Sequence, residues 1–211
     1  MKKVILFGST GAIGSALKEC LLKQELDLTA FVRKATNSSP NEHFEEVVVN
    51  FDQLESIQRN ANAVFIALGT TIKKAGSADA FKAVDRDLVI RIALWAKSQG
   101  IPEIHLVSSI GTSANAKGLY LQTKYEVENA IETLGFDTIH IYRPSLLIAD
   151  RGCEKRFGES VSVPFMKMIS HLGGKMKKYR PITVEKVAAF MSSQLGKGLS
   201  DVYIYESDQM Q

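Results

Sequence analysis

Tyr120 and Lys124 form the clearest pair of reactive side chains in this sequence. They are four residues apart at the start of a segment whose apolar residues recur at helical spacing, so both are expected on one face of a helix. A neighbouring ammonium group favours the phenolate form of a tyrosine, which can then exchange a proton with an alcohol or a carbonyl. Ser108 and Ser109 precede the pair and offer hydroxyl groups that could bind the substrate oxygen. The alternative is an ordinary amphipathic helix anchored by a tyrosine.

A second candidate site is the glycine-rich segment of residues 8–14, Gly-Ser-Thr-Gly-Ala-Ile-Gly. It follows a continuous apolar run and precedes residues at helical spacing, so it is predicted to join a buried strand to the start of a helix. Unpaired amides at such a helix start can receive a diphosphate, and the glycines allow close approaches that a side chain would prevent. The spacing differs from the common G-x-G-x-x-G pattern, so the prediction of dinucleotide binding depends on this context. An ordinary strand-to-helix turn is the alternative.

Two basic residues indicate which dinucleotide is preferred. NAD-binding proteins of this type commonly place an acidic residue at the end of the second strand, where Arg33 and Lys34 stand here. A guanidinium group can bind a 2′-phosphate through two parallel hydrogen bonds. We therefore expect NADP(H), with NAD(H) less favoured, although two solvated basic residues would give the same pattern. With such a cofactor, Lys124 could also hydrogen-bond the nicotinamide ribose.

Strands and helices alternate along the first two thirds of the predicted structure. This alternation implies right-handed crossovers and an α/β fold, a Rossmann-type doubly wound parallel sheet with helices on both faces. Apolar runs predict strands at residues 4–7, 28–32, 46–49, 63–68, 104–107 and 138–142, and apolar stripes predict helices around 13–21, 81–95 and 127–134.

The pattern loosens after Pro144, where we expect helices near 161–171 and 184–195 and a last strand near 202–205. This tail is too short for a separate domain. Residues 1–211 are therefore expected to form a single domain, in which about 145–211 makes a short C-terminal lobe on the substrate side of the cleft. A basic cluster in this tail is more typical of a solvated loop than of an anion site; its members are Lys175, Lys177, Lys178 and Arg180.

Composition excludes several classes of function. The net charge of +3, with both signs interspersed, argues against a nucleic-acid partner. No apolar run is long enough to cross a bilayer and no secretory signal is present, so no membrane partner is expected. Two cysteines fit a reducing compartment, which favours a cytoplasmic location, and the four histidines share no metal-ligand spacing. We expect a small-molecule substrate with a carbonyl or hydroxyl group, and a monomer or homodimer.

The order of these motifs resembles the short-chain dehydrogenase/reductase superfamily, specifically its atypical members. Further segments look like the Tat-interacting-protein oxidoreductase group and its bacterial relatives, which are often labelled nucleoside-diphosphate-sugar epimerases. The resemblance covers nearly the whole chain, and the combination is more specific than any one motif. The segments that carry it are 68–71, 74–76, 84–87, 120–122, 143–144 and 150–151.

The resemblance implies an NADP(H)-binding oxidoreductase that moves a hydride to or from a small carbonyl or alcohol. Tyr120 would be the acid/base, Lys124 its partner, and Ser109 or Ser108 the oxygen-binding serine. Two alternatives are a non-catalytic NADP(H)-sensing regulatory protein and a nucleoside-diphosphate-sugar epimerase. The implied cofactor contacts are Gly8, Ser9, Thr10, Gly11, Ile13, Gly14, Arg33, Lys34, Leu68, Gly69, Thr70, Lys124, Pro144, Ser145 and Leu147.

Overall fold

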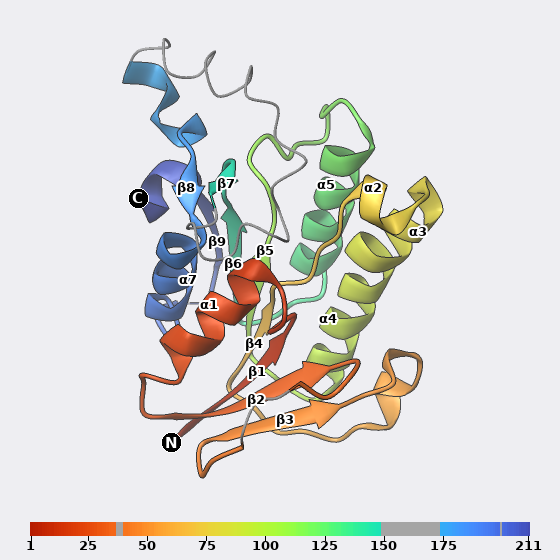
Figure 1. The fold of residues 1–211 in the computed structure, drawn as a ribbon, viewed down its shortest axis with the longest axis vertical. Helices are drawn as coiled ribbons and strands as arrows, with labels where there is room; N and C mark the ends of the chain where they lie inside the picture. The colour runs from red at the N-terminus through yellow and green to blue at the C-terminus, as the bar shows by residue number, and fades with distance from the viewer. Residues whose placement is uncertain (37–39, 149–173, 199) are drawn as a thin grey trace.

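A seven-stranded, fully parallel sheet forms the centre of the molecule (Figure 1). The computed structural model describes residues 1–36, 40–148, 174–198 and 200–211. The strand order β3-β2-β1-β4-β5-β6-β9 reverses its direction of growth between β1 and β4, so the prediction of a doubly wound α/β fold is confirmed. The strands are β1 (Lys2–Phe7), β2 (Leu26–Val32), β3 (Phe44–Val48), β4 (Ala63–Ile66), β5 (Glu103–Val107), β6 (Thr138–Arg143) and β9 (Val202–Glu206).

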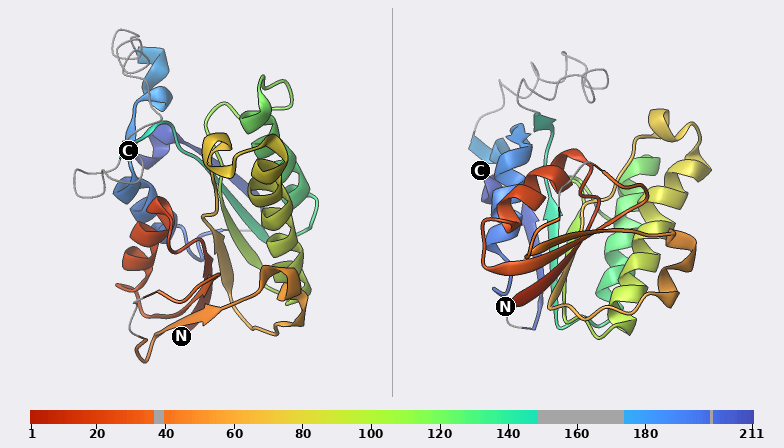
Figure 2. Two further views of the ribbon diagram at one scale, coloured as in Figure 1. Left: turned by 45° about the vertical axis from the view of Figure 1, so that its right-hand side comes forward. Right: turned by 60° about the horizontal axis from the view of Figure 1, so that its bottom comes forward.

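Helices cover both faces of the sheet (Figure 2). Two of them pack together on one face, and two others cover the opposite face. One helix of the second pair contributes the buried side chain of Trp95. Each of these helices buries one apolar stripe against strands that are themselves buried on both sides, as a parallel sheet requires. The first pair is α1 (Ala12–Leu21) and α7 (Val184–Ser193), and the second is α4 (Leu88–Ser98) and α5 (Leu119–Glu132).

The long helix predicted around residues 81–95 departs from a regular α-helix in its middle. α3 (Ala78–Lys82) and α4 are joined by a π-helical turn, η2 (Ala83–Asp87), so the prediction of one regular helix is wrong at this turn. A π turn contains one extra residue, so it shifts the buried face by one position along the chain: Asp85 and Val89 are buried, whereas Val84 and Leu88 are half-buried. Gly100, with φ +74°, follows the end of α4, where a glycine can adopt the left-handed conformation that ends a helix.

Strand and helix ends also differ from the predictions. The strand predicted at 63–68 ends at Ile66, because the chain turns away from the sheet there, and the helix expected to reach 195 ends at Ser193. The helix expected near 161–171 lies outside the described residues. Short elements that the sequence analysis did not foresee are η1 (Phe51–Ser56), α2 (Ile72–Ala75), η3 (Gly174–Tyr179), η4 (Ser207–Met210) and a two-stranded sheet of β7 (Leu147–Ile148) and β8 (Ile182–Thr183).

The last described segments extend the sheet and cover one of its faces. α7 packs against α1, and β9 pairs with β6 at the edge of the sheet. β9 is the strand that was predicted near residues 202–205. None of the helices among the described residues combines the length and the apolar content that a bilayer crossing requires.

Candidate functional site

The glycine segment joins the carboxyl end of β1 to the start of α1. Gly8 has φ +90°, and a Cβ atom there would lie 2.5 Å from the carbonyl oxygen of Ala67, just beyond β4. A Cβ on Gly14 would overlap the carbonyl oxygen of Gly8. Glycine is therefore required at both positions, because the loop lies directly against its own helix and against the end of the neighbouring strand.

The start of α1 has the features of an anion site. Its N-cap, Gly11, provides no side-chain hydrogen bond to the first turn, and the first turn contains no acidic residue. The Oγ atom of Ser9 is buried and has no hydrogen-bond partner within the described part of the chain. Unpaired amides, the positive end of the helix dipole and an unpartnered buried hydroxyl group together fit a diphosphate.

A cavity of about 650 Å³ lies at the carboxyl ends of β2 and β3. Arg33 lines it, as expected of the residue after the second strand, whereas Lys34 is exposed outside its lining. A second guanidinium, that of Arg91, lines the same cavity and lies 3.2 Å from a carboxylate oxygen of Asp52. The full lining is Arg33, Val48, Val49, Asn50, Phe51, Asp52, Ala83, Asp87, Leu88 and Arg91.

Tyr120 and Lys124 lie one turn apart at the start of α5, as predicted, but in different environments. The Tyr120 side chain is 39% exposed, and its ring centroid lies 5.9 Å from that of Phe81. Lys124 is only 5% exposed, and its Nζ atom lies 5.9 Å from the centre of the Tyr120 ring, at the limit of a cation–π contact. The ammonium group is thus next to the aromatic ring, with the phenol open to solvent.

Lys124 has a partner that the sequence analysis did not assign. The Oδ1 atom of Asp85 lies 3.0 Å from Lys124 Nζ, and Asp85 Oδ2 accepts a hydrogen bond of 2.7 Å from the backbone N–H of Thr70. Asp85 is 1% exposed. One signal was present in the sequence: Asp85 is an acidic residue four positions after Phe81, inside the segment predicted to form a helix with a buried apolar stripe, and a carboxylate that is buried there requires a partner.

The two serines after β5 have separate roles in the local structure. Ser108 is buried; its N–H donates to the carbonyl of Tyr142 over 2.7 Å, and its Oγ lies 3.5 Å from that of Thr112. Ser109 is half-buried, and its hydroxyl makes a long hydrogen bond of 3.4 Å to the carbonyl of Ile110. Ser109 is therefore the more accessible of the two hydroxyl groups.

Two further segments expected at the cofactor follow β4 and β6. Leu68, Gly69 and Thr70 lie after β4, and Gly69 leaves space beside the Asp85–Lys124 pair. After β6, the Ser145 hydroxyl donates to the carbonyl of Arg180 and accepts a hydrogen bond of 2.9 Å from Ser207. The Ser145 side chain is thus already bonded within the fold. Pro144 is buried and Leu147 is exposed in β7, paired with Ile182.

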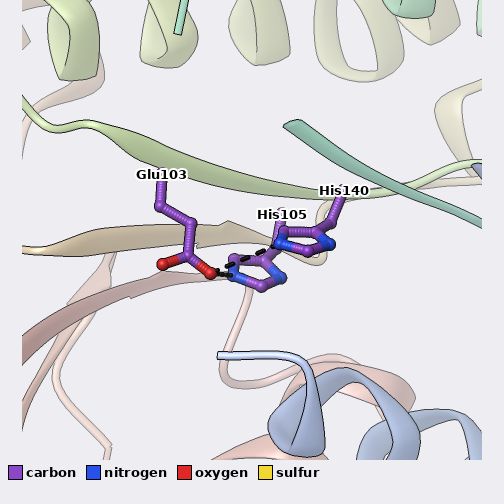
Figure 3. A group of neighbouring side chains, drawn as sticks. All are labelled: Glu103, His105 and His140. Carbon is purple, nitrogen blue, oxygen red and sulfur yellow. Dashed lines mark hydrogen bonds and ion pairs between the residues drawn. The ribbon is translucent and has the colours of Figure 1, made fainter. Parts of the chain in front are cut away.

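A separate group of polar side chains projects from β5 and β6 on one face of the sheet, near the amino end of β5 (Figure 3). Oε1 of Glu103 lies 2.9 Å from Nε2 of His105 and 3.4 Å from Nε2 of His140. Residues of these types can hold a metal ion, but the two imidazole rings stack with centroids 4.4 Å apart and planes 10° apart. Their in-plane lone pairs therefore run side by side. The lone pairs of two ligands of one ion would instead converge on a single point.

Hydrogen bonds account for this group, which we call the Glu103–histidine network. Burial alone would raise the pKa of Glu103, but a hydrogen bond from His105 and the neighbouring His140 lower it well below its usual range. Burial lowers the pKa of His105 to about 4, against the opposing effect of Glu103. Because an ionised carboxylate only accepts, His105 Nε2 donates to Glu103, whereas His140 Nε2 faces the carboxylate without a hydrogen-bond partner among the described residues. The Nδ1 atom of each histidine can accept from a tyrosine hydroxyl. These tyrosines are Tyr142, at 2.8 Å from His105, and Tyr205, at 3.1 Å from His140.

Comparisons with known proteins agree with the fold and the glycine segment. A family model described as NAD(P)H-binding matches residues 8–197. Protein HTATIP2 of Rattus norvegicus is 36% identical over 171 residues, which cover 78% of this chain and 70% of that protein. The Candida albicans protein named "FMP52, mitochondrial" is 33% identical over 165 residues, or 74% and 72% of the two chains.

The fold is also found among solved structures. A Bacillus halodurans protein described as an NAD-dependent epimerase/dehydratase superposes with a TM-score of 0.70 at 20% identity, covering 97% of this chain and 93% of that one. At this identity the similarity concerns the fold. With the family model spanning most of the sequence and HTATIP2 aligned over more than two thirds of its length, this chain belongs to the NAD(P)H-binding family and is a homologue of HTATIP2.

Proposed function

We propose that this protein is an NADP(H)-dependent oxidoreductase that acts on a small carbonyl or alcohol. The observation that carries the proposal is the arrangement at the carboxyl edge of the sheet. An uncapped helix start with glycine at each close approach follows β1, and a tyrosine–lysine pair opens α5. This edge is where ligands of doubly wound sheets bind, next to the point where the strand order reverses.

In this proposal the glycine segment holds the diphosphate of the cofactor. The amides at the start of α1 and the hydroxyl of Ser9 bind its oxygens, and the absence of an acidic residue in the first turn avoids repulsion. The Arg33 guanidinium, in the cavity after β2, binds the 2′-phosphate that distinguishes NADP from NAD. The backbone of residues 68–70 and the residues after β6, Pro144 among them, line the nicotinamide half.

The bound cofactor supplies or accepts a hydride, and the protein handles the proton. The hydroxyl of Tyr120, a partly exposed residue, gives a proton to the substrate oxygen, or takes one from it, as the hydride moves. The Lys124 ammonium beside the Tyr120 ring stabilises the phenolate that remains. The half-buried Ser109 hydroxyl donates a hydrogen bond to the same substrate oxygen.

Replacing Tyr120 tests the role assigned to it. Tyr120→Phe should lower kcat/KM for NADPH-dependent reduction by roughly 100- to 10,000-fold, the usual contribution of a positioned acid/base, and leave NADPH affinity nearly unchanged. The substrate is sought in a panel of aldehydes, ketones and nucleotide sugars, followed by NADPH absorbance. Tyr125→Phe, on the same helix, is the control. Full activity of Tyr120→Phe would overturn the assignment.

Location and assembly follow as lesser parts of the proposal. The two cysteines of the sequence support a cytoplasmic location, and the charge balance supports the absence of a nucleic-acid partner. For the assembly we propose a monomer or homodimer. Fractionation of cells and sedimentation of the purified protein would test each.

A further inference from the structure

The burial of Lys124 is unusual for a positively charged side chain. Lys124 is 5% exposed, and an ammonium group removed from water is stable only if a counter-charge or several acceptors compensate for its lost hydration. Asp85 supplies the counter-charge at 3.0 Å. The position of the Lys124 ammonium is therefore determined by the position of the Asp85 carboxylate as well as by α5.

Asp85 is itself fixed by elements other than α5. It belongs to the π turn η2, a type of helical irregularity often found at functional sites. Its Oδ2 atom accepts the N–H of Thr70 at 2.7 Å, and its side chain is buried. The turn is joined to α5 a second time, because Arg86 Nη1 lies 2.9 Å from Glu126 Oε2. Asp85 thus links the loop after β4 to the helix that carries Tyr120 and Lys124.

Gly69 allows the backbone of the loop after β4 to lie close to the charged pair. A Cβ atom added there would lie 3.4 Å from Asp85 Oδ1 and 4.0 Å from Lys124 Nζ. The two charged atoms therefore lie directly beside the backbone of this loop. This loop is the wall that the proposed function assigns to the nicotinamide half of the cofactor.

We propose that Asp85 is a positioning residue, which holds the Lys124 ammonium at the place where it binds the nicotinamide ribose and acts on Tyr120. This inference rests on the proposed function and adds a residue to it. Without the carboxylate, the ammonium would turn toward water on its flexible four-carbon chain. The cofactor would then lose its contact with Lys124.

A double-mutant cycle on NADPH affinity tests this dependence. The wild type, Asp85→Asn, Lys124→Met and the double variant are titrated with NADPH by calorimetry, and folding is checked by thermal unfolding. We expect Asp85→Asn to weaken binding about 10- to 100-fold, the range reported for lost positioning contacts. In the Lys124→Met background the same change should have almost no further effect, because Asp85 acts through Lys124.

A purely structural role for Asp85 would give a different cycle. The losses from the two single variants would then add, which would overturn the inference, as would unchanged binding in a folded Asp85→Asn protein. If Asp85→Asn does not fold, Asp85→Glu replaces it in the cycle, since it keeps the charge and moves it by one methylene group; the same non-additivity is expected. Glu126→Gln removes the exposed ion pair between the same two elements and should leave binding unchanged. Failure of the wild type to bind any nicotinamide nucleotide would instead refute the proposed function.

Discussion

Two buried ionic groups lie near opposite ends of the same sheet, and their charges are compensated in different ways. Near the carboxyl edge, Asp85 and Lys124 come from two helical segments and lie beside the backbone of Gly69, in the loop that follows β4. Near the amino end, Glu103 is enclosed by histidines of β5 and β6 and by the backbone N–H of Gly196, which donates to it at 2.8 Å. The first group lies at the edge where the proposed function places the cofactor, and the carboxylate of the second accepts hydrogen bonds from His105 and Gly196 within the fold.

The difference indicates how buried charge can be assigned to function or to structure. Both groups obey the rule that a charge removed from water must be compensated. In the Glu103–histidine network the partners surround the carboxylate, and stacked rings of Phe65 and His105, 3.9 Å apart, close one side. We therefore expect changes in that network to alter stability, and changes at the carboxyl edge to alter nucleotide affinity.

The largest expected effect on stability is the loss of Glu103. Glu103→Ala leaves the buried Nε2–H of His105 and the backbone N–H of Gly196 without their acceptor, at a cost of about 3 kcal/mol in the free energy of unfolding. Urea denaturation measures this loss, and NADPH affinity of the folded variant should stay within about twofold of the wild type. Glu45→Ala, at an exposed position, is the control. A large loss of affinity in Glu103→Ala with stability intact would break the distinction between the two groups.

Acid should weaken the same network. Burial lowers the pKa of His105 to about 4 in the folded protein, against an ordinary value of 6.5, so the unfolded chain binds a proton more readily. Its contribution is therefore complete above pH 6.5 and is lost as the pH falls toward 4, by about 3 kcal/mol in all. The lowered pKa of Glu103 adds a loss in the same direction below pH 4.5.

Urea denaturation between pH 4 and pH 7 measures this dependence. His105→Phe, which cannot take up the proton, should show a flatter profile over the same interval. A wild-type stability that is constant from pH 6.5 to pH 4.5 would contradict the burial of a neutral His105.

At the carboxyl edge, Arg33 should affect affinity and leave stability unchanged. Arg33→Ala should weaken NADPH binding by roughly 10- to 100-fold, since a hydrogen bond between charged groups contributes about 1.5–3 kcal/mol. Binding of NADH should change by less than about threefold, because NADH lacks the 2′-phosphate. Calorimetric titration of both nucleotides gives the ratio, with Lys34→Ala as the comparison. Equal losses for NADPH and NADH would exclude Arg33 as the 2′-phosphate contact.

The smallest expected effect concerns one hydroxyl at the rim of the Glu103–histidine network. Tyr205→Phe removes the partner of His140 Nδ1 at 3.1 Å and should cost about 1 kcal/mol of stability. Thermal unfolding can resolve this difference, and NADPH affinity should not change. A loss as large as that of Glu103→Ala would mean that Tyr205 has a larger role than one hydrogen bond.

Local patterns made most of the fold predictable from the sequence. The apolar run before Gly8 and the stripe through α1 are contained in about twenty consecutive residues, and each strand buried on both faces is a short apolar run. The boundaries were less predictable. β4 is two residues shorter than its apolar run, because Ala67 and Leu68 continue the composition after the chain has left the sheet.

The candidate site was predictable only where its residues are close together in sequence. Tyr120 and Lys124 are one helical turn apart, so their shared face follows from the period of a helix. Asp85 and Lys124 are brought together by the packing of η2 on α5, and the π turn that carries Asp85 has no simple sequence signal. The same holds for Arg91 and Asp52, which reach the Arg33 cavity from α4 and η1.

The most direct test of the account is calorimetric titration of the wild-type protein and of Gly14→Val with NADPH. The account predicts saturable binding by the wild type and none measurable by a folded Gly14→Val, because the added side chain would occupy the position of the Gly8 carbonyl. Absence of heat with NADPH, NADP⁺, NADH and NAD⁺ at millimolar concentration, or equal binding by both proteins, would contradict the claim that the start of α1 holds a dinucleotide.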